Sequence, residues 1–387
     1  MEEWKQYRLI DVLDTLIDYR GKTPKKTMSG IPLITAKIIK NGRIETPTEF
    51  ISVDDYDSWM VRGFPMIGDV VLTTEAPLGE VAQLDNANIA LAQRVVTLRG
   101  KSDVLDNTYL KYYFLSNVGH QRLKARETGT TVTGIKQSEL RKVLVDVPPY
   151  EIQVKISNIL KSLDDKIEVN RRINDNLEQQ AQALFKSWFV DFEPFRDQPF
   201  VESELGMIPE GWRVGKLGEL CQFKRGKGLL SKNAIPGDVP VVAGGLGPSC
   251  YHNVSNTKAP VITISGSGAN AGFMRMYHQE VWASDCSFID VTCENWLFVY
   301  CFLVINSHLL KHAQTGAVQP HVKPADIHDF DLVIPPRETI QKFQNTISSF
   351  IRKKGIIEQE SRRLAQLRDT LLPRLMSGEI KVGDVTL

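Results

Sequence analysis

The chain has 387 residues, of which 42% are hydrophobic and 24% are charged, and its formal net charge at pH 7 is +1. This composition is typical of a globular protein with room for two or three domains. No apolar run reaches the roughly 18 residues that a membrane-spanning helix needs, and the polar start Met1-Glu2-Glu3-Trp4-Lys5 does not resemble a secretory signal. We therefore expect a cytoplasmic protein without a membrane partner. A balanced total charge neither indicates nor excludes nucleic acid as a ligand.

Cysteine usage agrees with a reducing compartment. The cysteines are odd in number, contain no Cys-x-x-Cys pair and all follow residue 220: Cys221, Cys250, Cys286, Cys293 and Cys301. We expect reduced thiols rather than a disulfide framework or a zinc site.

The first part of the chain predicts a mixed α+β domain. It begins with Tyr7-Arg8-Leu9 and a basic turn, Arg20-Gly21-Lys22, and residues 20–50 remain basic and rich in turn residues. Residues 70–74 and 92–98 are rich in β-branched and apolar side chains, which predicts two strands.

A helical segment and a long helix complete this first half. Residues 108–126 predict a helix, followed by a Thr128-Gly129 loop and a short apolar strand that ends at Pro148-Pro149. From 151 to 189 the chain has neither proline nor glycine, and apolar side chains recur at steps of three and four residues. This pattern predicts a helix of about 60 Å with a narrow apolar seam that packs against another helix. The opposite faces carry charged residues, Glu178 among them.

The second half repeats the first. Its opening, Trp212-Arg213-Val214 and Arg225-Gly226-Lys227, matches the start of the chain at an offset of 205. The later elements in the second half are predicted strands at 261–265 and 286–291, a glycine-rich turn at 266–272 and a helical segment at 296–313. Residues 191–209 predict a linker between the halves, and Pro373 and Gly378 are expected to end a second long helix.

The long helices match at an offset of 187 that holds for about 80 residues, which indicates an internal duplication. Lys136, Pro148 and Pro149 correspond to Lys323, Pro335 and Pro336. The residues expected to pack the two helices together are Ile156, Leu160, Leu163, Leu177, Leu184 and Trp188 in the first helix and Phe343, Ile347, Phe350, Leu364, Leu371 and Leu375 in the second. Two charged residues, Lys354 and Arg368, fall near the second seam.

These patterns predict an α+β fold in which two similar mixed α/β domains, related by pseudo-twofold symmetry, are separated by two long antiparallel coiled-coil helices. The expected bounds are a first domain at 1–150, a helical spacer with its linker at 151–197, a second domain at 198–336 and a second helical spacer at 337–387.

Three motifs raise the possibility of catalysis or cofactor binding, and each has a structural explanation that we prefer. Val147 before Pro148-Pro149-Tyr150 lacks the side-chain acceptor of an adenine-methyltransferase loop, so the prolines are better explained as a stop before the helix. The glycines of 266–272 have the wrong spacing for a dinucleotide loop. His308 and His312 have a spacing that suits a metal but lack an HExxH context.

Basic side chains in loops are the stronger functional signal. Arg20, Lys22, Lys25 and Lys26 fall within seven residues, and Lys224, Arg225 and Lys227 occupy the corresponding place in the second half. Such groups supply phosphate contacts, and base readout needs polar groups beside them. The further candidates for DNA contact are Thr35, Lys37, Arg94, Thr131 and Lys136 in the first half and Asn270, Arg275, Gln319, His321 and Lys323 in the second.

The chain resembles the specificity subunits of type I restriction–modification systems along nearly its whole length. The resemblance rests on Thr128-Gly129, Gly134-Ile135-Lys136, Glu139-Leu140, the run Val145 to Pro149, Gln153 and Ile156, on the echo of this segment from Thr315 to Phe343, and on the helix end Leu184 to Phe189.

The resemblance implies a non-catalytic subunit in which each domain reads one half of a bipartite target in double-stranded DNA and the helices set the separation of the halves. It also implies two methyltransferase subunits and ATP-driven restriction subunits as partners. No cofactor is expected in this chain, because the resemblance places S-adenosylmethionine, ATP and Mg on those partners. A stand-alone DNA adenine methyltransferase and a coiled-coil scaffold without DNA contact remain the alternatives.

Overall fold

A computed structural model describes residues 4–129, 133–315 and 320–385. The chain forms two compact units: unit 1 comprises Met1–Glu168 and Arg362–Leu387, and unit 2 comprises Val169–Ser361. Each unit therefore contains a globular part and a portion of both long helices, whereas the sequence-based domain bounds separate the helices from the globular parts. Within the described residues, no helix combines the length and apolar character that crossing a membrane requires.

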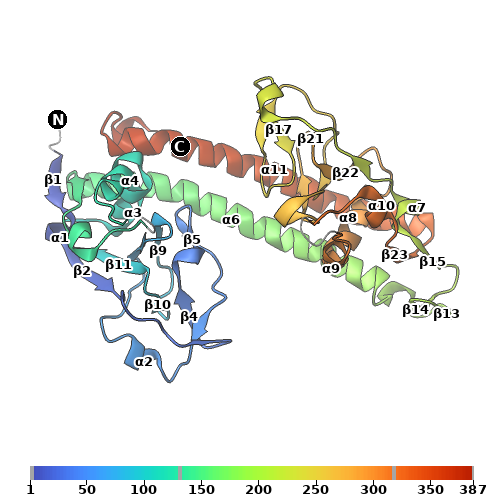
Figure 1. The fold of residues 1–387 in the computed structure, drawn as a ribbon, viewed down its shortest axis with the longest axis horizontal. Coiled ribbons are helices and arrows are strands. Elements are labelled where there is room, and N and C mark those ends of the chain that lie inside the picture. The colour runs from blue at the N-terminus through green and yellow to red at the C-terminus, as the bar shows by residue number, and fades with distance from the viewer. Residues whose placement is uncertain (1–3, 130–132, 316–319, 386–387) are drawn as a thin grey trace. The chain divides into compact units, whose positions relative to one another are not determined.

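Unit 1 is a mixed α/β structure (Figure 1). Its strands are β1 (Lys5–Arg8), β2 (Leu13–Asp18), β3 (Lys26–Thr27), β4 (Ile31–Ile34), β5 (Ile39–Lys40), β6 (Arg43–Ile44), β7 (Phe50–Ile51), β8 (Val70–Thr74), β9 (Leu78–Gln83), β10 (Ala90–Leu91), β11 (Val95–Gly100) and β12 (Leu144–Val147). Its short helices are α1 (Leu9–Val12), η1 (Ala36–Ile38), α2 (Tyr56–Trp59), α3 (Asn107–Leu115), α4 (Asn117–Lys124) and α5 (Gln137–Leu140).

Unit 2 has the same kinds of element. Its strands are β13 (Phe200–Ser203), β14 (Gly206–Pro209), β15 (Arg213–Lys216), β16 (Lys224–Arg225), β17 (Val239–Val242), β18 (Cys250–His252), β19 (Val261–Ser265), β20 (Met274–Tyr277), β21 (Trp282–Ala283), β22 (Cys286–Asp290) and β23 (Asp331–Ile334). Its short helices are η2 (Glu193–Phe195), α7 (Leu217–Leu220), η3 (Ser231–Asn233), η4 (Gly268–Asn270), α8 (Trp296–Ile305), α9 (Ser307–His312) and α10 (Pro324–His328), and η5 (Val382–Asp384) lies in the C-terminal part of unit 1.

The sheets confirm that the two globular parts are similar. The central antiparallel sheet has the order β2-β11-β8-β9 in unit 1 and β16-β22-β19-β20 in unit 2. A second sheet contains the parallel pair β4–β10 in unit 1 and β17–β21 in unit 2. An antiparallel pair leads toward each long helix, β1 with β12 and β15 with β23. The same strand order with the same directions is what a duplicated sequence should produce.

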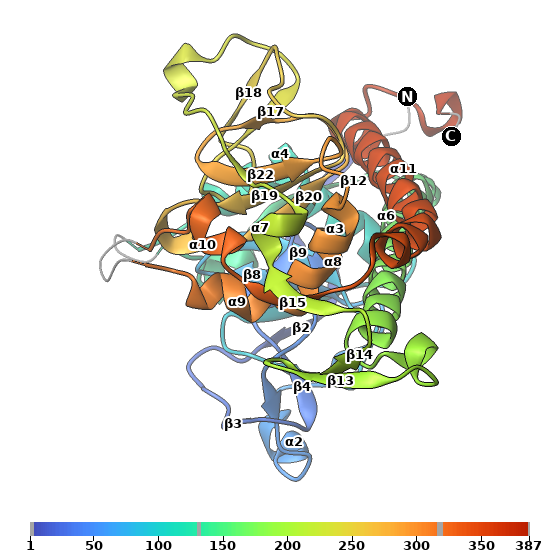
Figure 2. The same ribbon diagram turned by 90° about the vertical axis from the view of Figure 1, so that its right-hand side faces the viewer.

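One helix covers the central sheet in each unit, because both surfaces are apolar. In unit 2, α8 lies beside the central sheet (Figure 2). It is buried along most of its length and shares one core with Ile262, Ile264 and Ile289 of the sheet. In unit 1, Tyr109, Tyr112 and Phe114 of α3 share a core with Val70 and Val96. The predicted helical segments at 108–126 and 296–313 are each interrupted once, at Ser116 and at Asn306.

The two long helices, α6 (Tyr150–Phe189) and α11 (Arg337–Met376), begin directly after the proline pairs, as predicted. In unit 1, Ile156 and Leu160 near the start of α6 share a buried core with Leu375 and Met376 at the end of α11. In unit 2, the end of α6 packs with the start of α11, and Phe185 contacts Phe343 at a ring-centroid distance of 5.7 Å. Within each unit the helices are therefore antiparallel, which confirms the prediction.

The predicted packing residues are all buried or half-buried, and nine of the twelve belong to the cores that contain both long helices; the exceptions are Leu163, Leu177 and Leu364. Buried positions are Ile156, Leu160, Leu163, Leu177, Phe343, Ile347 and Leu375, and half-buried positions are Leu184, Trp188, Phe350, Leu364 and Leu371. Ala181, Phe185, Phe189 and Ile351 are also buried in the core of unit 2 and were not on the predicted set. Glu178 was expected on a solvated face, and this expectation was wrong, because its carboxylate bonds Lys354 of α11.

Two further expectations, those for Pro373 and for the cysteines, were wrong, and the predicted linker contains a hairpin that the sequence did not indicate. Pro373 lies inside α11, which continues to Met376; only the last turn loses a backbone donor there, and Gly378 follows with a positive φ of 71°. The predicted linker at 191–209 contains the hairpin β13–β14. Cys221 and Cys293 form a disulfide across 72 residues of sequence, whereas all five cysteines were expected to be reduced. The fold brings these two side chains together, and no local pattern could indicate that.

Candidate nucleic-acid interface

Three segments that are far apart in sequence meet at the end of β8 in unit 1. The backbone N–H of Thr74 donates to the carbonyl oxygen of Arg94 (3.0 Å), and the N–H of Ile135 donates to the carbonyl oxygen of Thr74 (2.9 Å). Thr128 and Gly134 exchange two backbone hydrogen bonds, of 2.7 and 3.0 Å, and thereby close the Thr-Gly loop next to this crossing. We call the crossing, with the side chains on it, the unit 1 junction.

Charged side chains gather on the unit 1 junction. The Arg20 guanidinium bonds Asp18 (2.8 Å) and donates to the carbonyl oxygen of Ile135 (2.5 Å), so it ties the first basic turn to the Thr-Gly loop. Arg94 pairs with Glu75 (2.8 Å), and both side chains are more than a third exposed. Lys136, next to Ile135, is exposed. The structure thus brings together three of the predicted DNA-contacting residues.

Unit 2 has the same backbone crossing. The N–H of Gly266 donates to the carbonyl oxygen of Asp285 (3.1 Å), and the N–H of Val322 donates to the carbonyl oxygen of Gly266 (3.1 Å). Thr315 and His321 exchange backbone bonds of 3.0 and 2.8 Å, as Thr128 and Gly134 do in unit 1. We call this crossing, with its side chains, the unit 2 junction.

The side chains on the unit 2 junction differ from those of unit 1. The Arg225 guanidinium and the Ser267 hydroxyl both bond the carboxylate of Asp285. Gly266 permits this approach, because a Cβ there would lie 2.5 Å from Nη1 of Arg225. Lys323 is exposed and His321 is half-buried beside these groups.

The backbone bonds align the two junctions position by position. Thr74 corresponds to Gly266, since each accepts a bond from the Thr-Gly strand and donates to the strand beside it. Glu75 then corresponds to Ser267 and Arg94 to Asp285. The Glu75–Arg94 ion pair of unit 1 is therefore replaced in unit 2 by Ser267 and Asp285. The position of the cation Arg94 is thus occupied by an anion, Asp285. The scaffold is the same and the polar groups that it presents are not.

The remaining candidates of unit 1, apart from Thr131, lie between β2 and β5. Lys22 and Lys25 are exposed, Lys26 pairs with Glu49 (2.8 Å), and Lys37 is exposed on η1. The Thr23 hydroxyl donates to Gln93 (2.8 Å), which holds the basic turn next to the segment of Arg94. Thr35 is only 9% exposed, so little of its side chain is available to a ligand. Thr131 lies outside the described residues.

The remaining candidates of unit 2 form two groups. Lys224 and Lys227 are exposed on either side of Arg225. Asn270 and Arg275 lie on the lining of a hollow of about 610 Å³, with Lys311 and Gln314. The Arg275 guanidinium lies 5.0 Å from the ring centroid of Tyr277, and burial raises the pKa of that phenol although Arg275 opposes the change. Gln319 lies outside the described residues.

Sequence analysis missed four groups on or beside the junctions, namely Glu75, Asp285, Ser267 and Arg62. Glu75 and Asp285 are acids, and a search for basic clusters passes over them. Arg62 donates from Nη1 to the carbonyl oxygens of Asp18 (2.6 Å) and Arg20 (3.1 Å), and it is a lone arginine in sequence. Among the described residues there is no group of three or more His, Cys, Asp or Glu side chains placed to hold a metal ion. DNA contact by the candidate residues remains a prediction.

The motif at Pro148-Pro149 has a structural role. The side-chain amide of Gln153, which is fully buried, donates to the carbonyl oxygens of Pro148 (2.9 Å) and Val104 (2.9 Å), and its oxygen accepts from the N–H of Asp106 (2.9 Å). Val147 is itself buried in β12. These contacts join the start of α6 to the globular part of unit 1.

Comparisons with known proteins agree with this architecture. A family model described as "Type I restriction modification DNA specificity domain" matches residues 1–179 and 209–367. The chain is 29% identical to the type I restriction enzyme MjaIX specificity subunit of Methanocaldococcus jannaschii, over 94% of this chain and 91% of that protein. It is 24% identical to the HindI specificity subunit of Haemophilus influenzae, over 98% of this chain and all of that protein (100%). The crystal structure of an S subunit from M. genitalium shares the fold, with a TM-score of 0.58 at 20% identity over 96% of both chains.

Proposed function

Because the chain belongs to the family of type I restriction–modification DNA specificity subunits, we propose that it is the subunit that reads the DNA target of such a complex and is not itself an enzyme. The observation that carries this proposal is the pair of junctions: one backbone scaffold is present twice and displays different polar groups. Two readers of different half-sites need this combination, because base identity is read by the pattern of donors and acceptors.

The proposal divides the work within each junction. The exposed cations Lys136 and Lys323, which occupy equivalent positions, contact phosphates and supply affinity that depends on salt. The groups that differ, Arg94 with Glu75 in unit 1 and Asp285 with Ser267 in unit 2, face base edges and supply the choice of sequence. Arginine prefers guanine and a carboxylate accepts from cytosine, so the two units prefer different half-sites.

The long helices act as a spacer in this proposal. A helix of 40 residues is about 60 Å long, and one turn of DNA is about 34 Å. Deleting residues 170–176 from α6 and 356–362 from α11 removes one heptad from each helix. This shortens the pair by about 10 Å, or about three base pairs. The two half-sites should stay the same while the preferred gap between them becomes about three base pairs shorter.

The partners and cofactors follow from the same proposal. The helix pair docks two methyltransferase subunits, and restriction subunits join the complex. S-adenosylmethionine, ATP and Mg are bound by those partners. A stand-alone adenine methyltransferase is less well supported, because the Pro148-Pro149 segment is occupied by structural contacts with Gln153. A scaffold without DNA contact does not explain why the two junctions carry different groups on one backbone.

The decisive experiment maps methylated adenines in DNA exposed to the chain assembled with its methyltransferase subunits. We expect a bipartite target with two different halves and a constant gap. Loss of methylation when the chain is left out is the control. Methylation without a bipartite pattern, or transfer of methyl groups by the chain alone, would overturn the proposal.

A further inference from the structure

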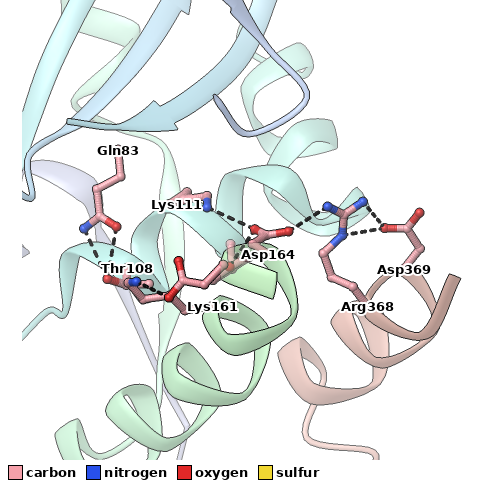
Figure 3. A network of polar contacts seen from close by, with 9 residues as sticks. Gln83, Thr108, Lys111, Lys161, Asp164, Arg368 and Asp369 are labelled. Carbon is pink, nitrogen blue, oxygen red and sulfur yellow. Dashed lines mark hydrogen bonds and ion pairs between the residues drawn. The ribbon is translucent and has the colours of Figure 1, made fainter. Parts of the chain in front are cut away.

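In each unit an ion pair between α6 and α11 interrupts the largely apolar seam, and in unit 2 the amide of the buried Asn170 also donates to the carboxylate of Glu360 (2.7 Å). In unit 1, Oδ1 of Asp164 accepts from Arg368 (2.7 Å), and its Oδ2 lies 3.1 Å from the Lys111 ammonium (Figure 3). The same Oδ2 accepts from the Tyr112 hydroxyl (2.7 Å). We call these four residues the unit 1 charged layer. The side chain of Lys111 is only 10% exposed, and those of Asp164 and Arg368 are about a fifth to a quarter exposed.

The unit 2 charged layer consists of Glu178, Lys354 and Tyr300. The Glu178 carboxylate pairs with the Lys354 ammonium and accepts from the Tyr300 hydroxyl (3.0 Å). Both side chains of the ion pair are less than a fifth exposed. Burial by itself would raise the pKa of Glu178, but Lys354 and the hydrogen bonds outweigh burial and hold the pKa below its ordinary value.

The two layers occupy positions that do not correspond in the duplication. At the offset of 187, Asp164 corresponds to Ile351 and Arg368 to Ala181, and both of these are buried apolar residues of unit 2. Glu178 corresponds to Ala365 and Lys354 to Ile167, which are again apolar. Each layer is thus charged in one repeat and apolar in the other.

The charged layers therefore distinguish the pairing of α6 with α11 from the pairing of like helices in two copies of the chain. The apolar seam residues alone would allow both. The seam residues of the two helices correspond, as Ile156 does to Phe343 and Leu160 to Ile347, so α6 could pack on the α6 of a second copy through the same kinds of contact. In the register of this structure, however, Glu178 would then face Ile167 of the second copy, and Asp164 would face its Ala181. A pair of α11 helices would place Lys354 opposite Ala365 and Arg368 opposite Ile351.

We propose that the two charged layers select the pairing of α6 with α11 and exclude the pairing of like helices from two copies of this chain. A half-buried charge that loses its partner is strongly unfavourable, whereas an apolar replacement of the whole pair is tolerated. Charged groups at otherwise apolar seam positions are a known means of setting which helices pair. The layers lie two heptads apart in each helix, 164 to 178 and 354 to 368, so a single antiparallel register satisfies both.

The Glu178–Lys354 contact is the more discriminating of the two. Asp164 keeps Lys111 and Tyr112 of α3 as partners when Arg368 is lost, and Arg368 also bonds Asp369 (2.7 Å). Within the part of the chain that the structure describes, Glu178 has Lys354 as its cationic partner, and the other groups that bond its carboxylate, Tyr300 and Gln182, are neutral. Removal of this pair should therefore have the larger effect on pairing.

The test uses the full chain and replaces the charged residues of the two layers, while the apolar seam residues stay unchanged. The first variant combines Glu178→Ala with Lys354→Ile, which installs the residues found at the corresponding positions of unit 1. The second variant adds Asp164→Asn and Arg368→Ala, where asparagine keeps an acceptor for Lys111 and Tyr112. The control replaces Lys161 and Asp165, an exposed i,i+4 pair on α6, with alanine.

Each protein is unfolded, refolded at several concentrations, checked for helix content by circular dichroism and sized by light scattering. The wild-type chain and the control should refold as monomers, and the first variant should contain at least about tenfold more dimer than the wild type. The second variant should contain more dimer still. If only one of the two variants refolds, the dimer content of that variant tests the proposal.

A cross-link identifies which helices pair in the dimer. Ile173 lies between the two layers along α6, and in the register given above it would face residue 172 of the second copy, so Ile173→Cys brings two cysteines together only when α6 packs on α6. In the charge-removed variants, mass spectrometry should find a disulfide between the two copies at this position, and in the wild-type background it should not. Variants that refold as monomers without this cross-link, or an equal cross-link in the wild-type background, would overturn the proposal.

Discussion

The two junctions have the same backbone and different side chains. Thr74 and Gly266 make equivalent hydrogen bonds to two neighbouring segments, and a Thr-Gly loop is closed in the same way beside each of them. At the equivalent side-chain positions, Arg94 is a cation and Asp285 is an anion. The duplicated scaffold is therefore retained where it holds the loops in place, and it has diverged where side chains reach solvent.

The helix pair shows the same principle inside the protein. The contact between α6 and α11 is aromatic in unit 2, where Phe343 lies 5.7 and 5.0 Å from Phe185 and Phe189 by ring centroids. The corresponding contact in unit 1 is aliphatic, with Ile156 and Leu160 beside Leu375. Corresponding positions of the two repeats thus hold side chains that pack differently. Substituting corresponding residues therefore allows the stabilities of the two units to be compared.

The largest expected effect comes from this core. Phe343→Ala should lower the free energy of unfolding by about 3–5 kcal/mol, and Ile156→Ala, its counterpart in unit 1, by about 2–5 kcal/mol, because each leaves a cavity. Urea unfolding measures both, and Leu367→Ala, at a position 41% exposed, is the control that should change little.

Thiol labelling can tell which unit has been weakened. The buried cysteines Cys286 and Cys301 both lie in unit 2, and burial raises the pKa of the Cys286 thiol to about 12, so both should react slowly in the native protein. Phe343→Ala should speed their labelling more than Ile156→Ala does. Equal acceleration by both variants would show that the two units unfold together.

The second effect concerns DNA and tests whether the junctions read different half-sites. Arg94→Ala should relax base preference in one half of the target only, and Asp285→Ala in the other half only, each at about 1–3 kcal/mol per lost base contact. The measurement is binding by the assembled complex to a panel of targets with single base changes. Lys161→Ala, on α6, is the control. A uniform loss of affinity across all targets would assign these side chains to phosphates instead.

A smaller effect on the free energy of unfolding is expected from the difference between the N-termini of α3 and α8, the helices that cover the two central sheets. The carboxylate of Asp106 caps α3 by accepting from the N–H of Tyr109 (2.7 Å), whereas Asn295 at the start of α8 makes no such side-chain bond. Asp106→Ala should lower the free energy of unfolding by about 1 kcal/mol. Asp106 also accepts from the Ser157 hydroxyl (2.6 Å), whereas Asn295→Ala removes, within the described residues, only the bond from its amide to the carbonyl oxygen of Leu220 (3.2 Å). Asn295→Ala should therefore cost less in the same assay, and an equal cost would contradict this expectation.

The smallest effect is a pH dependence of stability. Burial would raise the pKa of Asp164 and of Glu178, but their cationic and hydrogen-bonding partners outweigh burial and hold both pKa values below the ordinary range. A depressed pKa in the folded state favours folding above the unfolded pKa of about 4 and loses this contribution as the pH falls below it. Stability should therefore decrease below about pH 4, and Asp164→Asn with Glu178→Gln should flatten that decrease. Asp165→Asn, at an exposed position, should leave it unchanged.

Local patterns allowed much of the fold to be predicted. The proline pairs place the starts of α6 and α11 correctly, because proline is compatible with the beginning of a helix and not with its interior. The shared offset of 187 predicted two similar globular parts, and the periodicity of the apolar residues predicted most of the helix contact. The basic turns located Arg20 and Arg225, which lie on the two junctions.

Only the tertiary structure decided which polar groups meet. The sequence by itself determined the duplication, the long helices and the basic loops, since these depend on spacing along the chain. It did not show that Glu178 faces Lys354, that Cys221 reaches Cys293, or that Glu75 and Asp285 lie on equivalent junctions. Those contacts join segments that are distant in sequence, and a side chain's neighbours there depend on how the sheets and helices pack, which no local periodicity encodes.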